Sequence, residues 1–123
     1  MMEVVKFSGR ETRLEVLDAH TNRLQGRLPV NLVTLENLRS LNLGHNLFSG
    51  PIPMQYGAML EGSWRSLFLD YNFLAGNLPP HFASSDIKGS LANNCLRCPP
   101  SIPWCHGGQR PASECAGKNT GGG

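Results

Sequence analysis

The sequence predicts an α/β repeat fold: a solenoid of about three coils, with a short parallel sheet on its concave side and a cysteine-rich C-terminal cap. One pattern of leucines, an asparagine, a glycine and a proline recurs three times at fixed offsets along the chain. Each unit begins with apolar residues that alternate with a period of two, which is typical of a strand with one buried face. All four cysteines follow the last unit, between Cys95 and Cys115.

The bulk composition is that of one small folded domain. The 123 residues are 40% hydrophobic, which is enough for a core, and 16% are charged, with a net charge of +2. No basic block is present, so the sequence predicts no nucleic-acid partner. No apolar stretch reaches the length of a membrane-spanning helix, and the N-terminal residues lack the apolar segment of a signal peptide.

The repeats are expected to occupy residues 14–83, after a degenerate or partial N-terminal coil over residues 1–13. Their fixed positions are Leu14, Leu17, Ala19, Asn22, Leu24, Gly26, Leu28 and Pro29, then Leu38, Leu41, Leu43, Asn46, Phe48, Gly50, Ile52 and Pro53, then Trp64, Leu67, Leu69, Asn72, Leu74, Gly76, Leu78 and Pro79. The asparagines are 24 and 26 residues apart, so the third unit has two extra residues, expected within Tyr56–Ser63.

The chemistry of the repeated positions explains why such a unit coils. Leucines at a period of two point inward from a short strand. The asparagine that follows can bond backbone groups of adjacent coils, because Asn side chains readily make turn hydrogen bonds, and stacked asparagines then form a ladder. Glycines allow tight turns, and prolines end strand pairing on the convex side. Helical or 3-10 turns are expected over Val30–Leu35 and Met54–Met59, with Leu32, Leu35, Tyr56 and Met59 inward.

The motif LxxLxLxxNxLxGxLP resembles the plant-specific class of leucine-rich repeat. The match covers about Leu14 to Phe82, with Ala19 and Trp64 as mild departures from leucine and Phe48 as a common variant. This class occurs in the ectodomains of receptor-like kinases and receptor-like proteins and in polygalacturonase inhibitors. The resemblance implies a protein-binding solenoid, located in the apoplast or at the plasma membrane, with a capping segment after its last repeat.

The cysteine-rich segment is assigned to residues 84–116, followed by a flexible Gly-rich tail over residues 117–123. An even, clustered set of cysteines predicts disulfides, and the candidates are Cys95, Cys98, Cys105 and Cys115. Three pairings are possible, of which a bond between Cys95 and Cys98 would close a tight loop. Zinc is the alternative, because Cys95 and Cys98 form half of a zinc motif, although the second half lacks the matching spacing.

The end of the last coil exposes an apolar face that such a segment can cover. Ile102 and Trp104 are the expected covering groups. No equivalent cap is recognisable before the first repeat, so Leu14, Leu17 and Leu24 are expected at an open edge that Val4, Val5 and Phe7 would cover in part.

The strand residues between the inward leucines are expected to line the concave surface, where solenoids bind their partners. The binding candidates are Asp18, His20, Arg39, Asn42, His45, Arg65, Phe68, Asp70 and Tyr71. Phe68 and Tyr71 are the expected anchors, because exposed aromatic residues concentrate binding energy. The histidines and aspartates of this face have no nucleophile or third ligand in register, so the sequence predicts no enzyme, no cofactor and no metal site.

The sequence therefore predicts a module that binds a protein or peptide ligand through its concave face. By resemblance, its role is in signalling or defence recognition, and it is expected to be a truncated member, the tail of a longer ectodomain. The alternatives are a cell-wall enzyme inhibitor of the polygalacturonase-inhibitor type and a degenerate fragment without independent function. If Met1 is the true start, the missing signal peptide places the chain in the cytosol instead. The oligomeric state is not indicated.

Overall fold

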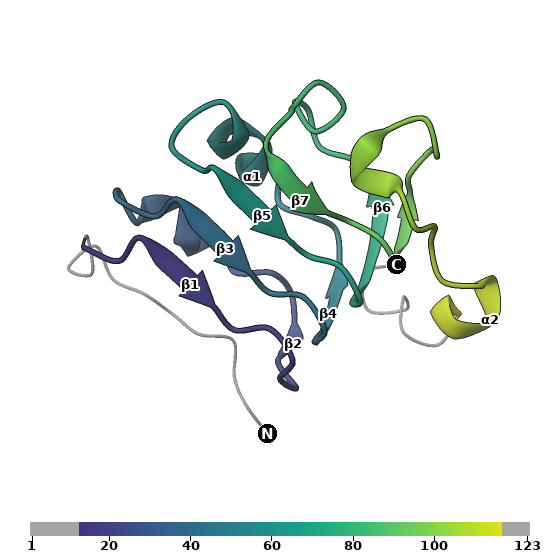
Figure 1. Cartoon of the computed structure of the whole chain (residues 1–123). Coiled ribbons are helices and arrows are strands. Elements are labelled where there is room, and N and C mark those ends of the chain that lie inside the picture. The colour runs from purple at the N-terminus through teal and green to yellow at the C-terminus, as the bar shows by residue number, and fades with distance from the viewer. Residues whose placement is uncertain (1–12, 117–123) are drawn as a thin grey trace.

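Each repeat unit forms one turn of a solenoid, here called a coil. The computed structural model describes residues 13–116 and contains two parallel four-stranded sheets (Figure 1). The concave sheet consists of β1 (Val16–Asp18), β3 (Ser40–Asn42), β5 (Ser66–Phe68) and β7 (Lys88–Ser90). The second sheet consists of β2 (Gln25–Gly26), β4 (Leu47–Gly50), β6 (Phe73–Asn77) and β8 (Cys95–Arg97). The predicted α/β solenoid with a parallel concave sheet is therefore confirmed.

The strand register aligns equivalent residues of successive coils. Leu17, Leu41, Leu67 and Gly89 are register partners across the concave sheet. Leu41 and Leu67 are buried, whereas Leu17 of the first coil is only partly buried. Burial of each such side chain stabilises the fold by about 1.5–3 kcal/mol. The core is thus a stack of leucine layers, and the layers inside the stack are the most completely buried.

The return segments are short and helical, as the sequence predicts. A 3-10 helix, η2 (Val30–Thr34), closes the first coil, and the helix α1 (Met54–Leu60) closes the second. The inward residues Leu32, Leu35 and Tyr56 are fully buried, while Met59 is partly buried against the core. The Tyr56 hydroxyl donates to the Pro29 carbonyl at 2.7 Å, which joins the two return segments. Burial of the Tyr56 side chain raises the pKa of its hydroxyl.

The asparagine ladder joins the coils through one repeated set of hydrogen bonds. In Asn46, Asn72 and Asn94, the amide oxygen accepts from a backbone N–H of the preceding coil at 3.0 Å. The amide nitrogen donates to carbonyls of its own coil and of the preceding one. All three side chains are buried. Asn22 is exposed, and within residues 13–116 it bonds only to its own coil.

The second sheet and the fourth coil were not predicted from the sequence. Pro29, Pro53 and Pro79 follow the strands β2, β4 and β6 of the second sheet. The fourth coil comprises β7, the ladder residue Asn94 and β8, and it forms the first part of the segment assigned to the cap. Its pattern was hidden because Gly89 stands where the other coils have an inward leucine. The expected partial N-terminal coil and the Gly-rich tail lie outside the described residues, apart from Arg13.

The cap replaces the side chain that Gly89 lacks. Trp104, in the 3-10 helix η3 (Pro103–Cys105), is buried and packs edge-on against Phe82, with ring centroids 5.1 Å apart. A Cβ at Gly89 would overlap the Trp104 ring and the Leu67 carbonyl oxygen, so only glycine leaves room for the indole. Trp104 is therefore the covering group that the sequence predicts, and Ile102 packs beside it, partly buried.

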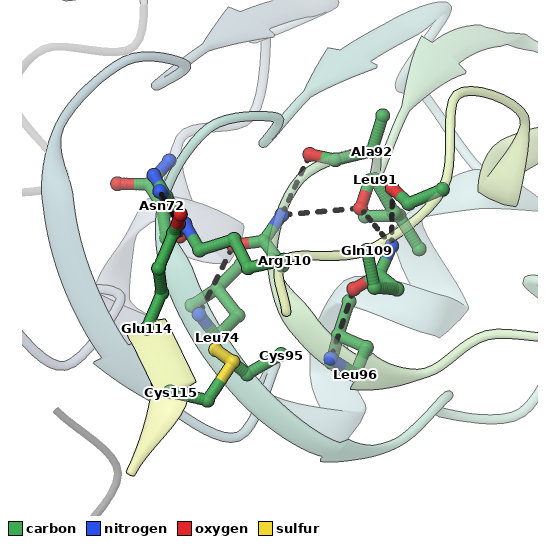
Figure 2. Close-up of a disulfide and its surroundings, with 12 residues drawn as sticks. Asn72, Leu74, Leu91, Ala92, Cys95, Leu96, Gln109, Arg110, Glu114 and Cys115 are labelled. Carbon is green, nitrogen blue, oxygen red and sulfur yellow. Dashed lines mark hydrogen bonds and ion pairs between the residues drawn. A yellow bond between two sulfur atoms is a disulfide. The ribbon is translucent and has the colours of Figure 1, made fainter. Parts of the chain in front are cut away.

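The segment after Trp104 continues the hydrogen-bond pattern of the stack. Figure 2 shows the Gln109 side chain accepting from the Leu96 N–H at 2.9 Å and donating to the Leu91 carbonyl at 2.9 Å. These bonds match those of a ladder asparagine, so Gln109 acts as a fifth rung supplied by the cap. The Arg110 guanidinium donates to the Asn72 carbonyl at 2.7 Å and lies 4.0 Å from the centroid of the Phe73 ring.

Two disulfides hold the cap to the last coil. Cys95 in β8 is bonded to Cys115 in the helix α2 (Ala112–Cys115), and Cys98 is bonded to Cys105 (Figure 2 draws the first pair). The predicted disulfides are confirmed, and the tight Cys95–Cys98 loop is not formed. The zinc alternative is wrong, because all four thiols are consumed.

Candidate protein-binding site

The predicted site residues lie in columns that cross the concave sheet. Asp18, Asn42 and Phe68 are register partners at the ends of β1, β3 and β5. Two residues further along each coil, His20 and Asp70 flank Gly44. Arg39 and Arg65 precede their strands, with the Arg65 N–H donating to the Arg39 carbonyl at 2.6 Å. The candidates on neighbouring coils are thus brought together, one coil spacing of about 4.8 Å apart.

The most organised group of this surface joins the second and third coils. The rings of His45 and Tyr71 are stacked, with centroids 4.2 Å apart and planes inclined by 17°. The His45 Nε2 atom lies 3.6 Å from a carboxylate oxygen of Asp70. Tyr71 remains 42% exposed. Three predicted residues therefore form one accessible cluster in which an aromatic face adjoins a carboxylate.

A repeated backbone conformation positions this cluster. Thr21, His45, Tyr71 and Asn93, each just before the ladder asparagine, have φ between 57° and 58°. Non-glycine residues rarely adopt this left-handed conformation, and it costs on the order of 1 kcal/mol or more. The buried asparagine bonds hold it in place. His45 and Tyr71 were predicted as site residues, but their left-handed backbone was not, although their constant position before each asparagine marks it.

Asp18 and His20 form a separate pair in the first coil. A carboxylate oxygen of Asp18 is hydrogen-bonded to the His20 ring and accepts from the His20 backbone N–H at 3.2 Å. The bond to the His20 side chain is the main cause that lowers the pKa of Asp18, and the backbone bond adds to it. The histidines and aspartates of this face are thus divided between two pairs. Within residues 13–116, no three His, Cys, Asp or Glu side chains are grouped to hold a metal ion.

The fold has a solved counterpart. The leucine-rich-repeat ectodomain of the receptor kinase SOBIR1 from Arabidopsis thaliana superposes with a TM-score of 0.60 at 25% identity, over 82% of this chain and 57% of that chain. The family model described as Leucine Rich Repeat matches residues 37–59. This chain has the leucine-rich-repeat fold.

Sequences similar to this chain occur among plant receptor-like proteins and kinases. Receptor-like protein 48 of Arabidopsis thaliana is 35% identical over 79 residues, which are 64% of this chain and 9% of that protein. The LRR receptor-like serine/threonine-protein kinase EFR of the same plant is 47% identical over 51 residues, or 41% of this chain and 5% of the kinase. The chain thus spans less than a tenth of the length of these two relatives.

Two more residues of the concave face, Gly44 and Arg65, affect the geometry of the site. Gly44 lies beneath the site, because a Cβ there would be 2.8 Å from the Asp70 Oδ1 atom and 3.2 Å from the Asn42 Oδ1 atom. Gly44 is placed on the concave face by its sequence position, but the close approach of the Asp70 carboxylate to it was not predicted. Arg65 is partly engaged elsewhere, since its guanidinium donates to the Gly62 carbonyl at 2.9 Å.

No helix within residues 13–116 has the length and apolarity needed to cross a bilayer.

Proposed function

We propose that this chain binds a protein or peptide ligand through its concave face, in a signalling or defence-recognition role like that suggested by its receptor-like relatives. The observation that carries the proposal is the cluster of His45, Asp70 and Tyr71, with Phe68 beside it on the same strand end. Aromatic side chains held in one conformation give large contact area at low entropic cost, which is typical of binding hot spots. The role proposed is binding rather than catalysis.

The size of the concave surface determines how many of its residues such a ligand must contact. A partner of ordinary affinity buries about 800 Å² on each side, which is most of the concave face that four strands form within residues 13–116. We therefore propose that the ligand contacts the columns of Asp18, Arg39 and Asn42 as well as the aromatic cluster. By resemblance, we place this binding outside the cell or at the plasma membrane.

A peptide-display selection tests the proposal. The purified chain is first checked for a cooperative thermal transition, because a chain without one would support the alternative of a fragment with no independent function. It is then immobilised and selected against a library of displayed random peptides. The site variant carries Phe68→Ser and Tyr71→Asn, which places the fourth coil's own residues, Ser90 and Asn93, at the equivalent positions.

The expected result is that selected peptides bind this double variant at least about 30-fold more weakly, since a hot spot contributes 2 kcal/mol or more. Met54→Ala is the matched control, because Met54 is 70% exposed on α1, away from the concave strands. Equal binding by the wild type and the double variant would contradict the proposal. Inhibition of a polygalacturonase by the chain would favour the inhibitor alternative.

A further inference from the structure

In three of the four described coils, a side chain from the concave sheet accepts a hydrogen bond from the equivalent backbone N–H, and this bond is here called a cap. The Asp18 carboxylate accepts from the His20 N–H at 3.2 Å, the Asn42 amide oxygen from the Gly44 N–H at 2.9 Å, and the Ser90 hydroxyl from the Ala92 N–H at 3.1 Å. In each case the acceptor lies two residues before the donor. Short polar side chains make such local caps readily.

The third coil lacks this cap. The residue in the same register is Phe68, whose side chain has no hydrogen-bond acceptor. The Asp70 N–H therefore has no side-chain cap from its own coil. No group within residues 13–116 accepts a hydrogen bond from this N–H. Because the caps of the other coils come from concave-facing side chains, the uncapped N–H is directed to the concave surface. The break in the pattern coincides with the aromatic cluster.

The surroundings of the Asp70 N–H add an acceptor and two apolar flanks. The Asp70 carboxylate extends over Gly44, where the absence of a side chain leaves room for the Oδ1 atom. Its other oxygen lies towards His45. Phe68 stands on one side in sequence and Tyr71 on the other, and Tyr71 is half exposed. Asp70 thus offers a hydrogen-bond donor and an acceptor, with Phe68 two positions before it and Tyr71 directly after it in sequence.

We propose that Asp70 binds an amide edge of the ligand: a C=O that accepts from the Asp70 N–H, next to an N–H that donates to the Asp70 carboxylate. A cation would be disfavoured by the N–H and an anion by the carboxylate, whereas an amide edge satisfies both groups. Such an edge occurs in the primary carboxamide of Asn or Gln and in the main chain of one extended residue. This inference rests on the proposed concave-face function and names the chemistry of its central subsite.

Amide hydrogen exchange, followed residue by residue by NMR, tests the free donor without any ligand. The Asp70 N–H is expected to exchange at least about 10-fold faster than the capped Gly44 N–H, after correction for intrinsic sequence effects. Phe68→Asn copies the cap of Asn42 and should slow the exchange at Asp70. Phe68→Leu is the matched control, which removes the ring but supplies no acceptor and should leave the fast exchange unchanged. Slow exchange at Asp70 in the wild type would overturn the inference.

Titration with small probes tests the ligand chemistry. Propionamide represents the primary carboxamide, N-acetylleucine methylamide the extended main chain, and guanidinium and acetate ions the charged alternatives. A saturable shift of the Asp70 N–H resonance is expected with one or both amides, and the stronger of the two identifies the source. Phe68→Asn should abolish it. A larger response to guanidinium or acetate, or no saturable response to either amide, would overturn the inference.

The peptide selection separates this inference from the proposed function. If displayed peptides depend on Phe68 and Tyr71 while Asp70 responds to neither amide, the binding function stands and the amide subsite is wrong. If no concave-face residue affects peptide binding, the proposed function itself fails.

Discussion

The two ends of this solenoid are built from the same repeat but finished differently. At the C-terminal end, Asn94 has no exposed surface, and Gln109 and Trp104 complete its coil from the cap. At the N-terminal end, Asn22 is exposed and Leu17 is only partly buried among the described residues. The difference shows that a leucine or asparagine in the motif is stabilising only when a neighbouring coil, or a substitute for one, lies against it.

The capped end should therefore be the more sensitive one. Trp104→Ala removes the indole that fills the space above Gly89 and is expected to lower the free energy of unfolding by about 3–5 kcal/mol. Denaturant titration measures the loss. Ile102→Ala is the control, since Ile102 is only partly buried and should cost clearly less. Equal losses in the two variants would mean that Trp104 does not close the stack.

The disulfides belong to the same end and should rank next. Replacing Cys95 and Cys115 by alanine opens a loop of 20 residues and is expected to cost about 3 kcal/mol on loop entropy. Replacing Cys98 and Cys105, which are 7 residues apart, should cost about 2.5 kcal/mol. Thermal melts of both double variants, with and without reductant, test this ranking. A wild-type melting temperature that reductant leaves unchanged would contradict the stabilising role of both disulfides.

The ladder gives the most direct comparison between the interior and the N-terminal end. Asn72→Ala leaves the Phe48 N–H and several carbonyls buried without a partner, at about 2–4 kcal/mol in total. Asn22→Ala changes an exposed side chain and should cost less than about 1 kcal/mol. Both values come from denaturant unfolding. Similar losses at the two positions would show that a further layer covers Asn22.

Most of the fold was predictable from the sequence because the repeat fixes strand, turn and ladder together. Leu41, Asn46 and Tyr56 occupy the roles that their spacing predicts. The fourth coil was not recognised, because Gly89 replaces a leucine whose volume is supplied by Trp104 from a distant part of the chain. A motif read along the sequence cannot show such a replacement across space.

The site was predictable in its columns but not in its pairings. The alternation of strand residues identifies which side chains face outward, including Phe68. The stack of His45 on Tyr71 depends on their left-handed backbone and on the register between two coils. The N–H of Asp70 is free because Phe68 has no acceptor, and only the coils in which Asn42 and Ser90 supply an acceptor make this difference apparent. The binding role of these residues stays a prediction.

The fifth rung extends the comparison to the cap itself. Gln109→Ala removes the acceptor of the Leu96 N–H and a donor to the Leu91 carbonyl. Because these groups are only partly buried, the expected loss is about 1–2 kcal/mol, below that of Asn72→Ala. Gln55→Ala is a matched control on the exposed side of α1. A loss no larger than that of the control would mean that water replaces Gln109 without cost.

The smallest expected effect lies at the N-terminal end of the described residues and depends on pH. The hydrogen bonds from the side chain and the backbone of His20 hold the pKa of Asp18 below its ordinary value. The pKa in the folded chain is thus lower than in the unfolded chain, so the stabilisation is present above the unfolded value of 3.8 and is lost as pH falls through the folded value. Asp18→Asn keeps an acceptor for the His20 N–H, as Asn42 does for Gly44, but removes the charge.

The stability difference between the wild type and this variant should therefore shrink as pH is lowered from about 6 to about 2.5, and denaturant unfolding across that range measures it. The effect is expected to be small because both side chains are half exposed and the pair is screened by solvent. Added salt should reduce it further. A wild type that becomes more stable relative to Asp18→Asn on acidification would mean that the charged Asp18 carboxylate destabilises the first coil.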